Sequence, residues 1–179
     1  MKKNILRRMC ETGVIAALYT VLTLVIPAAS FGPLQLRLSE LLTILPVFTP
    51  AAIPGLTLGC LFSNTIGLSM GTNLAGAWDL VFGTLATLVS ALCTYFLRNV
   101  TIRNIPVLAA LPATIFNSLI VGTELNILLF QMEKHTWFLC VAEVGVGELI
   151  VATVGGLVVY FMLEETGAAK HIFRGGIHS

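Results

Sequence analysis

The feature that most constrains this chain is a series of apolar runs, each close to the length of a membrane-crossing helix. The runs lie at about 12–29, 38–48, 51–68, 76–97, 105–129 and 137–163. A helix that spans a bilayer needs about 20 mainly apolar residues. Six spans use almost all of the 179 residues and leave no room for a soluble domain. The sequence therefore predicts an all-α integral membrane protein, a compact bundle of six transmembrane helices in one membrane domain over residues 1–179.

The composition agrees with this class and excludes others. Charged residues make up 11% of the chain, less than half of the roughly 25% typical of soluble domains. The mean hydropathy is +0.93. The net charge of +1 speaks against a nucleic-acid partner, because such proteins normally carry a basic patch or stripe.

The first apolar run has an alternative interpretation. A basic start, an apolar stretch and the small residues at 28–30 also fit a secretory signal peptide. A membrane span is favoured because the run is long and carries small residues at helical spacing, which permit close helix packing. These small residues are Thr12, Gly13, Ala16, Ala17 and Thr20.

The second run is short and interrupted by proline. The segment around it, from Phe31 to Pro54, is punctuated by Pro33, Pro46, Pro50 and Pro54. If Ser39 caps a helix from Glu40 to about Phe48, that helix rises only about 14 Å. Short, proline-interrupted segments in membrane bundles tend to line cavities, because their freed backbone groups need internal partners.

Lysine and arginine placement predicts the orientation. Basic residues gather in short cytoplasmic loops, and with an even number of spans the three basic clusters fall on one side. Both termini are therefore expected to be cytoplasmic. The clusters contain Lys2, Lys3, Arg7 and Arg8, then Arg98 and Arg103, then Lys170 and Arg174.

Ionisable residues within the spans are the main functional signal. A charge at the bilayer centre costs at least about 2.5 to 3.5 kcal/mol and usually marks a pathway or a site. Five acids lie in the outer half of the bundle, and Arg37 is the only cation near them. The acids are Glu40, Asp79, Glu124, Glu143 and Glu148.

Structural roles compete with function for most of these residues. Arg37 and Glu40 are spaced to pair with each other at i, i+3. Asp79 could be an interfacial or capping carboxylate, and Glu124 and Glu143 could be solvated. Glu148 lies near the middle of its span, so a functional role is favoured there.

Amides and aromatic rings extend the candidate set. Asn117 lies seven residues before Glu124, on the same helix face, and Asn64 could instead bond a neighbouring helix. A cavity lined by acids, amides and rings suits a flat, donor-rich or cationic ligand, since a carboxylate can accept two parallel hydrogen bonds from a guanine-like edge. The predicted substrate-binding residues are Glu40, Asp79, Asn117, Glu148, Arg37, Asn64, Glu124, Glu143, Trp78 and Phe116.

The chain lacks the motifs of an ATPase or a metalloprotein. It contains no G-x-x-x-x-G-K-[ST] phosphate loop, so we expect it not to be an enzyme. The cysteines at 10, 60, 93 and 140 have neither metal-ligand nor disulfide spacing. The histidines at 135, 171 and 178 lie in a loop or the tail. No cofactor or metal is expected.

Five sequence stretches carry a family resemblance. They are SFGPLQLRLSELLTILPVFTPAAIPG at 30–55, GCLFSN at 59–64, DLVFGTLATL at 79–88, NSLIVGTEL at 117–125 and GELIV at 147–151. In this order they resemble the QueT-like family of queuosine-precursor transporters.

The resemblance implies a substrate-binding S-component of an energy-coupling-factor (ECF) importer in a bacterial plasma membrane. Such a subunit would capture a queuosine precursor, a 7-deazaguanine or queuine-type base, from outside the cell. It would work with a transmembrane coupling protein and two cytoplasmic ATPases. By the same resemblance, Gly13, Ala16, Ala17 and Thr20 occupy the positions that dock against the coupling protein.

Two other functions remain open at this point. Intramembrane carboxylates also serve as proton relays, so a stand-alone proton-coupled transporter of a small cationic or nucleobase-like solute is the main alternative. A membrane-embedded enzyme is a third possibility, but no nucleophile and base occur at recognisable spacing.

Overall fold

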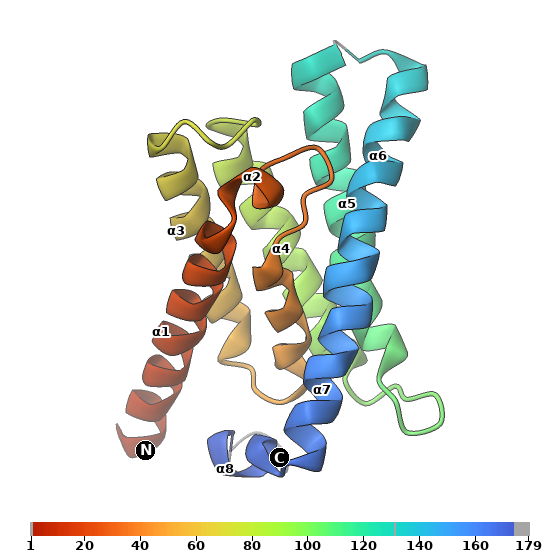
Figure 1. Ribbon diagram of the computed structural model, residues 1–179. Coiled ribbons are helices and arrows are strands. Elements are labelled where there is room, and N and C mark those ends of the chain that lie inside the picture. Colours follow the sequence, from red (N-terminus) through yellow and green to blue (C-terminus); the bar gives the residue numbers. More distant parts are fainter. Residues whose placement is uncertain (1, 131, 174–179) are drawn as a thin grey trace.

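A computed structural model of the chain describes residues 2–130 and 132–173 (Figure 1). Its elements are all helical: α1 (Lys2–Val25), α2 (Pro27–Ser30), η1 (Leu38–Val47), α3 (Ala52–Ser69), α4 (Trp78–Leu97), α5 (Val107–Phe130), α6 (Lys134–Glu148), η2 (Leu149–Gly155), α7 (Gly156–Glu165) and α8 (Ala168–Ile172). Among the basic and histidine positions discussed above, Arg174 and His178 lie outside the described residues.

Among the described residues, five helical segments are long and apolar enough to cross a membrane. They are Ile5–Val25, Ala52–Ser69, Trp78–Leu97, Val107–Phe130 and Lys134–Glu165. The all-helical architecture is therefore confirmed and is consistent with a membrane bundle, whereas the count of six spans stays a prediction. The last segment is continuous from α6 through the π-helix η2 into α7.

The boundaries of two predicted spans differ from the observed helices. α1 begins at Lys2 instead of near residue 12, because the basic residues before the apolar run are themselves helical. It ends at Val25, two residues before Pro27. The last helical segment begins at Lys134 instead of 137, because the polar residues at 134–136 form its first turn rather than a loop.

The second predicted span is the short, apolar 3-10 helix η1. Its ten residues rise about 20 Å at roughly 2 Å per residue, or about two-thirds of the hydrocarbon core. The predicted Ser39 cap is wrong. Arg37 flanks the helix without a side-chain cap bond, and the Ser39 hydroxyl instead accepts a 2.7 Å hydrogen bond from Thr23 Oγ1.

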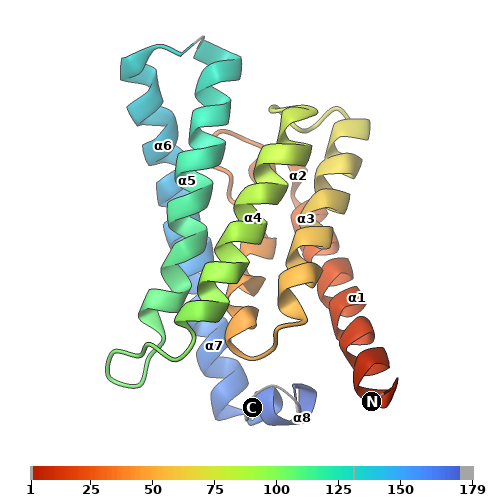
Figure 2. The ribbon, with the colours of Figure 1, turned by 180° about the vertical axis from the view of Figure 1, so that it is seen from behind.

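Successive segments run in alternating directions along the bundle. α1 rises, the segment from residue 31 to η1 returns through the middle, and α3, α4, α5 and α6–α7 follow (Figures 1 and 2). The start of α1, the α4–α5 loop with Arg98 and Arg103, and α8 lie at one end, which we call the basic end. Arg7 Nη2 ties α1 to α8 through a 2.7 Å hydrogen bond to the Ile172 carbonyl oxygen. That this end faces the cytoplasm stays a prediction.

Glycines on α3 allow α1 to approach closely. A Cβ on Gly59 would lie 2.6 Å from Tyr19 Cβ and 2.9 Å from the Ala16 carbonyl oxygen. Thr20 Oγ1 also donates a 3.2 Å hydrogen bond to the Gly59 carbonyl oxygen. Small residues at such contacts are how membrane helices gain packing energy without a hydrophobic driving force. The contact places Tyr19, which is fully buried, against the interior of the bundle.

We expect the substitution Gly59→Ala to destabilise the bundle. The added methyl group overlaps Tyr19 and the backbone of α1, and such overpacking typically costs about 1–3 kcal/mol. The melting temperature of the detergent-solubilised protein should fall. Gly13→Ala is the matched control, because a Cβ there meets no atom within 4 Å and alanine favours the helix. Equal melting temperatures for the two variants would contradict this packing analysis.

Candidate functional site

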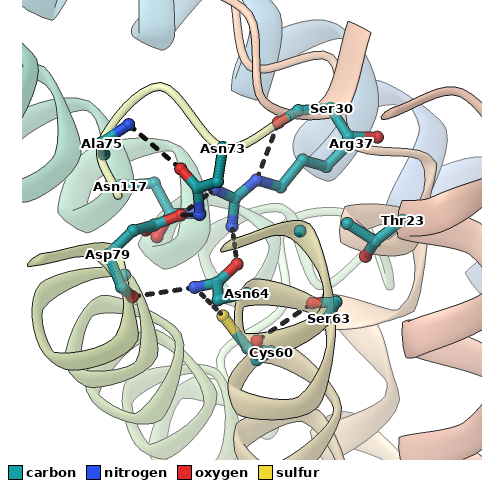
Figure 3. Close-up of polar contacts among 12 residues, drawn as sticks. Thr23, Ser30, Arg37, Cys60, Ser63, Asn64, Asn73, Ala75, Asp79 and Asn117 are labelled. Carbon is teal, nitrogen blue, oxygen red and sulfur yellow. Dashed lines mark hydrogen bonds and ion pairs between the residues drawn. The ribbon is translucent and has the colours of Figure 1, made fainter. Parts of the chain in front are cut away.

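A buried ion pair lies at the centre of the polar interior. Arg37 Nη2 donates to Asp79 Oδ2 at 2.7 Å, and the two residues are 3% and 0% exposed. Arg37 comes from the segment before η1, and Asp79 is the second residue of α4. The other two guanidinium nitrogens also donate: Nε to the Ser30 carbonyl oxygen at 3.0 Å and Nη1 to Asn64 Oδ1 at 3.5 Å (Figure 3). Such additional hydrogen bonds help to offset the cost of burying an ion pair.

Two asparagines hold Asp79 in place from the neighbouring chain segments. Asn64 Nδ2, on α3, donates to the Asp79 carbonyl oxygen at 2.8 Å. Asn73 Nδ2, in the α3–α4 turn, donates to Asp79 Oδ2 at 2.9 Å, and its own Oδ1 accepts from the Ala75 amide at 3.1 Å. Asn73 was not predicted from the sequence, where it looked like an ordinary turn residue. The available signal was that Asn73 lies six residues before Asp79, an acid at the start of an apolar run.

A second polar group lies beside the ion pair and contains two carboxylates. The Tyr19 hydroxyl donates to Glu40 Oε1, and Asn117 Nδ2 donates to Glu148 Oε1 at 2.9 Å. Glu40 and Glu148 lie within range of electrostatic interaction with each other, and Asn117 neighbours both. Both carboxylates are at most 2% exposed. Tyr19 was not among the predicted site residues, because a tyrosine within an apolar run gives no sign of an inward hydroxyl.

Three carboxylate oxygens in this interior have no hydrogen-bond partner among the described residues. They are Glu40 Oε2, Asp79 Oδ1 and Glu148 Oε2, and the nearby segment before η1 adds the unpartnered donor Gln35 Nε2. An unmade hydrogen bond on a buried group costs about 1–3 kcal/mol, and more when the group is charged. Three carboxylates and one guanidinium also leave two formal negative charges unbalanced. The arrangement is therefore suited to a solute that brings N–H donors and positive charge.

Glu148 ends α6, where the helix changes to the π-helix η2. Single π-turns inside α-helices occur frequently at functional sites. Thr153, within η2, is anchored to α5 because its hydroxyl donates to the Ala110 carbonyl oxygen at 3.1 Å and is 2.7 Å from Thr114 Oγ1. The sequence contains no marker of this irregular turn.

We call these six residues the central cluster: Arg37, Glu40, Asn64, Asp79, Asn117 and Glu148. Two of the structural roles that competed with a binding role are wrong for residues of this cluster. Arg37 forms its ion pair with Asp79 and not with Glu40. Asp79 is not a cap, since Ala77 flanks α4 without a side-chain cap bond, and it is not solvated, since it is fully buried.

The other four predicted site residues lie elsewhere. Glu124 is 4% exposed, and neither of its carboxylate oxygens has a hydrogen-bond partner in the described part of the chain. It lines a groove between α4 and α5 together with Trp78, which is exposed. Glu143 is exposed on α6, and Phe116 is half-buried on α5.

The predicted docking residues of α1 divide between two faces. Gly13 and Ala17 are exposed, whereas Ala16 is buried and Thr20 is half-buried against α3. The exposed positions lie among other exposed apolar side chains of α1, namely Val14, Leu18 and Val21. In the described part of the chain, no group of three or more histidine, cysteine or acidic side chains is arranged to hold a metal ion.

Comparison with known proteins identifies the family. The family described as QueT transporter matches residues 9–165. The curated protein named queuosine precursor transporter QueT, from Lactococcus lactis subsp. cremoris, is 35% identical over 92 residues. That match spans half of this chain and half of the length of the relative. No solved structure matches significantly. The family match extends from α1 to the end of α7 and includes every residue of the central cluster. The chain belongs to the QueT transporter family.

Proposed function

We propose that this chain is the substrate-binding S-component of an ECF importer and that it captures a queuosine precursor from outside the cell. The observation that carries this proposal is the set of three buried, unpartnered carboxylate oxygens in the central cluster. The name of the Lactococcus relative, a queuosine precursor transporter, supports the same solute class. The solute would be a 7-deazaguanine or queuine-type base.

The chemistry of such a base complements the central cluster. The guanine-like edge carries adjacent N–H donors, which one carboxylate can accept in parallel, and an amine substituent can pair with a second carboxylate. In this proposal Glu40, Asp79 and Glu148 contact the solute through their free oxygens. Arg37 and Asn117 bond the carboxylates of Asp79 and Glu148, and Asn64 positions Arg37 and the backbone of Asp79.

The architecture supports a membrane subunit that depends on partners. Adding the segment from residue 31 through η1 to the five long helices gives six crossings, with both termini on the cytoplasmic side in a bacterial plasma membrane. The chain has no phosphate loop, so ATP hydrolysis belongs to two cytoplasmic ATPases in the proposal. A transmembrane coupling protein would dock on the exposed face of α1 around Gly13 and Ala17, with Ala16 and Thr20 supporting that face from the α3 side.

A proton-coupled secondary transporter is the second candidate. It is favoured by the same buried carboxylates, because unpaired acids in a membrane can carry protons. The two functions differ in their energy source.

We expect Glu148→Gln to weaken solute binding roughly 10- to 100-fold, because hydrogen bonds to a charged group contribute about 1.5–3 kcal/mol. Calorimetry on the purified protein with 7-aminomethyl-7-deazaguanine measures the change. Glu143→Gln, on the exposed face of the same helix, is the matched control and should bind like the unaltered protein. Wild-type affinity in a folded Glu148→Gln variant would remove Glu148 from the site.

We expect Ala17→Trp to reduce assembly with the coupling protein and the ATPases, because a bulky ring prevents close approach to this face of α1. Co-purification of the three partners with the tagged chain measures assembly. Ala142→Trp, at another exposed alanine on α6, is the control. Solute affinity should stay the same in both variants. Unimpaired assembly of Ala17→Trp would place docking elsewhere.

Uptake should follow ATP rather than the proton gradient. In proteoliposomes that contain the whole complex, loading ATP inside should start accumulation of the labelled base, and a protonophore should leave it unchanged. A Walker-lysine variant of the ATPases should abolish it. Accumulation by this chain alone that collapses with the protonophore would instead establish the secondary transporter.

A further inference from the structure

The groove between α4 and α5 contains a further buried acid, Glu124, which is not part of the central cluster. The groove encloses about 470 Å³, within the usual range of roughly 300–1,000 Å³ for ligand sites. Among the described residues, Glu124 is the only acid that lines it, and neither of its carboxylate oxygens has a hydrogen-bond partner there. The rest of the lining is almost entirely apolar. A carboxylate in such surroundings is costly unless a cation or a proton neutralises it.

The groove opens sideways and not toward the bundle interior. Leu85, Leu119 and Leu128 line it and are 47%, 45% and 37% exposed. α4 and α5 lie side by side along the bundle (Figure 2). In a bilayer, side chains exposed on two adjacent spans would face lipid. The residues of the central cluster are absent from the lining.

The lining is polarised along the bundle. Trp78 is the first residue of α4, so it lies at the end opposite the basic end, and Phe82 stacks on it at 5.7 Å between ring centroids. Glu124 lies six residues before the end of α5, or about 9 Å from that end at 1.5 Å per residue. Leu85 and Leu119 lie deeper. Tryptophan is typical of the membrane interface, so the acid and the rings are near headgroup depth and the aliphatic part is at acyl-chain depth.

We propose that this groove binds a membrane lipid whose headgroup carries a primary ammonium. The ammonium would donate to Glu124 and lie near the faces of the Trp78 and Phe82 rings, which attract cations. One acyl chain would follow Leu85 and Leu119 toward the middle of the bilayer. Charge complementarity and the head-to-tail order of the lining favour a lipid over a soluble amine.

Lipid retention in native mass spectrometry tests the proposal. The full chain, purified in detergent, is mixed with palmitoyl-oleoyl phosphatidylethanolamine or with the phosphatidylcholine that has the same acyl chains. A quaternary ammonium has no N–H to donate, so we expect the ethanolamine lipid to be retained roughly tenfold better, as for one charge-assisted hydrogen bond. Glu124→Gln should remove this preference. The measurement needs no solute, so its outcome is independent of the proposed transport function.

A second pair of variants separates the groove from general lipid binding. Leu85→Trp fills the groove and should reduce retention of the ethanolamine lipid. Leu92→Trp, two turns further along α4, is exposed but does not line the groove and should have no effect. Equal retention of the two lipids by the unaltered protein, or an undiminished preference in a folded Glu124→Gln variant, would overturn the proposal. Equal effects of the two tryptophan substitutions would overturn the placement of the lipid.

Discussion

The arrangement of the polar interior depends on the ion pair between Arg37 and Asp79. It joins an irregular segment before η1 to the first turn of α4, 42 residues later, at 2.7 Å. Breaking a buried pair by removing one partner typically costs about 3–5 kcal/mol, because the other charge is left uncompensated. The pair therefore fixes the entry to η1. Since Glu40 follows Arg37 by three residues, the same contact also determines where the Glu40 carboxylate lies.

The ion pair also divides the acids into two kinds. The Asp79 carboxylate is the better compensated, because Arg37 and Asn73 both donate to its Oδ2, while Oδ1 has no partner among the described residues. Glu40 and Glu148 each receive one neutral hydrogen bond and retain a free oxygen. In a medium of low dielectric constant, such acceptors interact strongly with any donor that reaches them. A fixed, undercompensated pair of carboxylates thus favours a cationic solute and opposes an anionic one, and this preference is built in before the solute arrives.

The sequence predicted which polar residues lie in the interior better than it predicted which of them bond to one another. Glu40, Asp79 and Glu148 were recognisable because a charge within an apolar run needs a reason to be there. The shortness of η1 was recognisable from its prolines. The pairing of Arg37 was not, because an acid three residues away was the simplest partner and Asp79 is adjacent only in the folded bundle. The inward hydroxyl of Tyr19 depends on the close α1–α3 contact at Gly59, and the π-turn after Glu148 depends on packing against α5. Neither has a local sequence signal.

The first turn of α4 contributes to two different environments. Asp79 is fully buried at the central cluster, whereas its neighbour Trp78 is 57% exposed at the groove that contains Glu124. Consecutive residues on a helix point about 100° apart at 3.6 residues per turn, so one turn can present one side chain inward and the next outward. Gly83, one turn after Asp79, has no side chain, and a Cβ there would meet Asp79 Oδ1. The backbone of this turn therefore packs directly around the ion pair. The position of this one turn therefore sets both where Asp79 lies in the central cluster and where Trp78 lies in the groove.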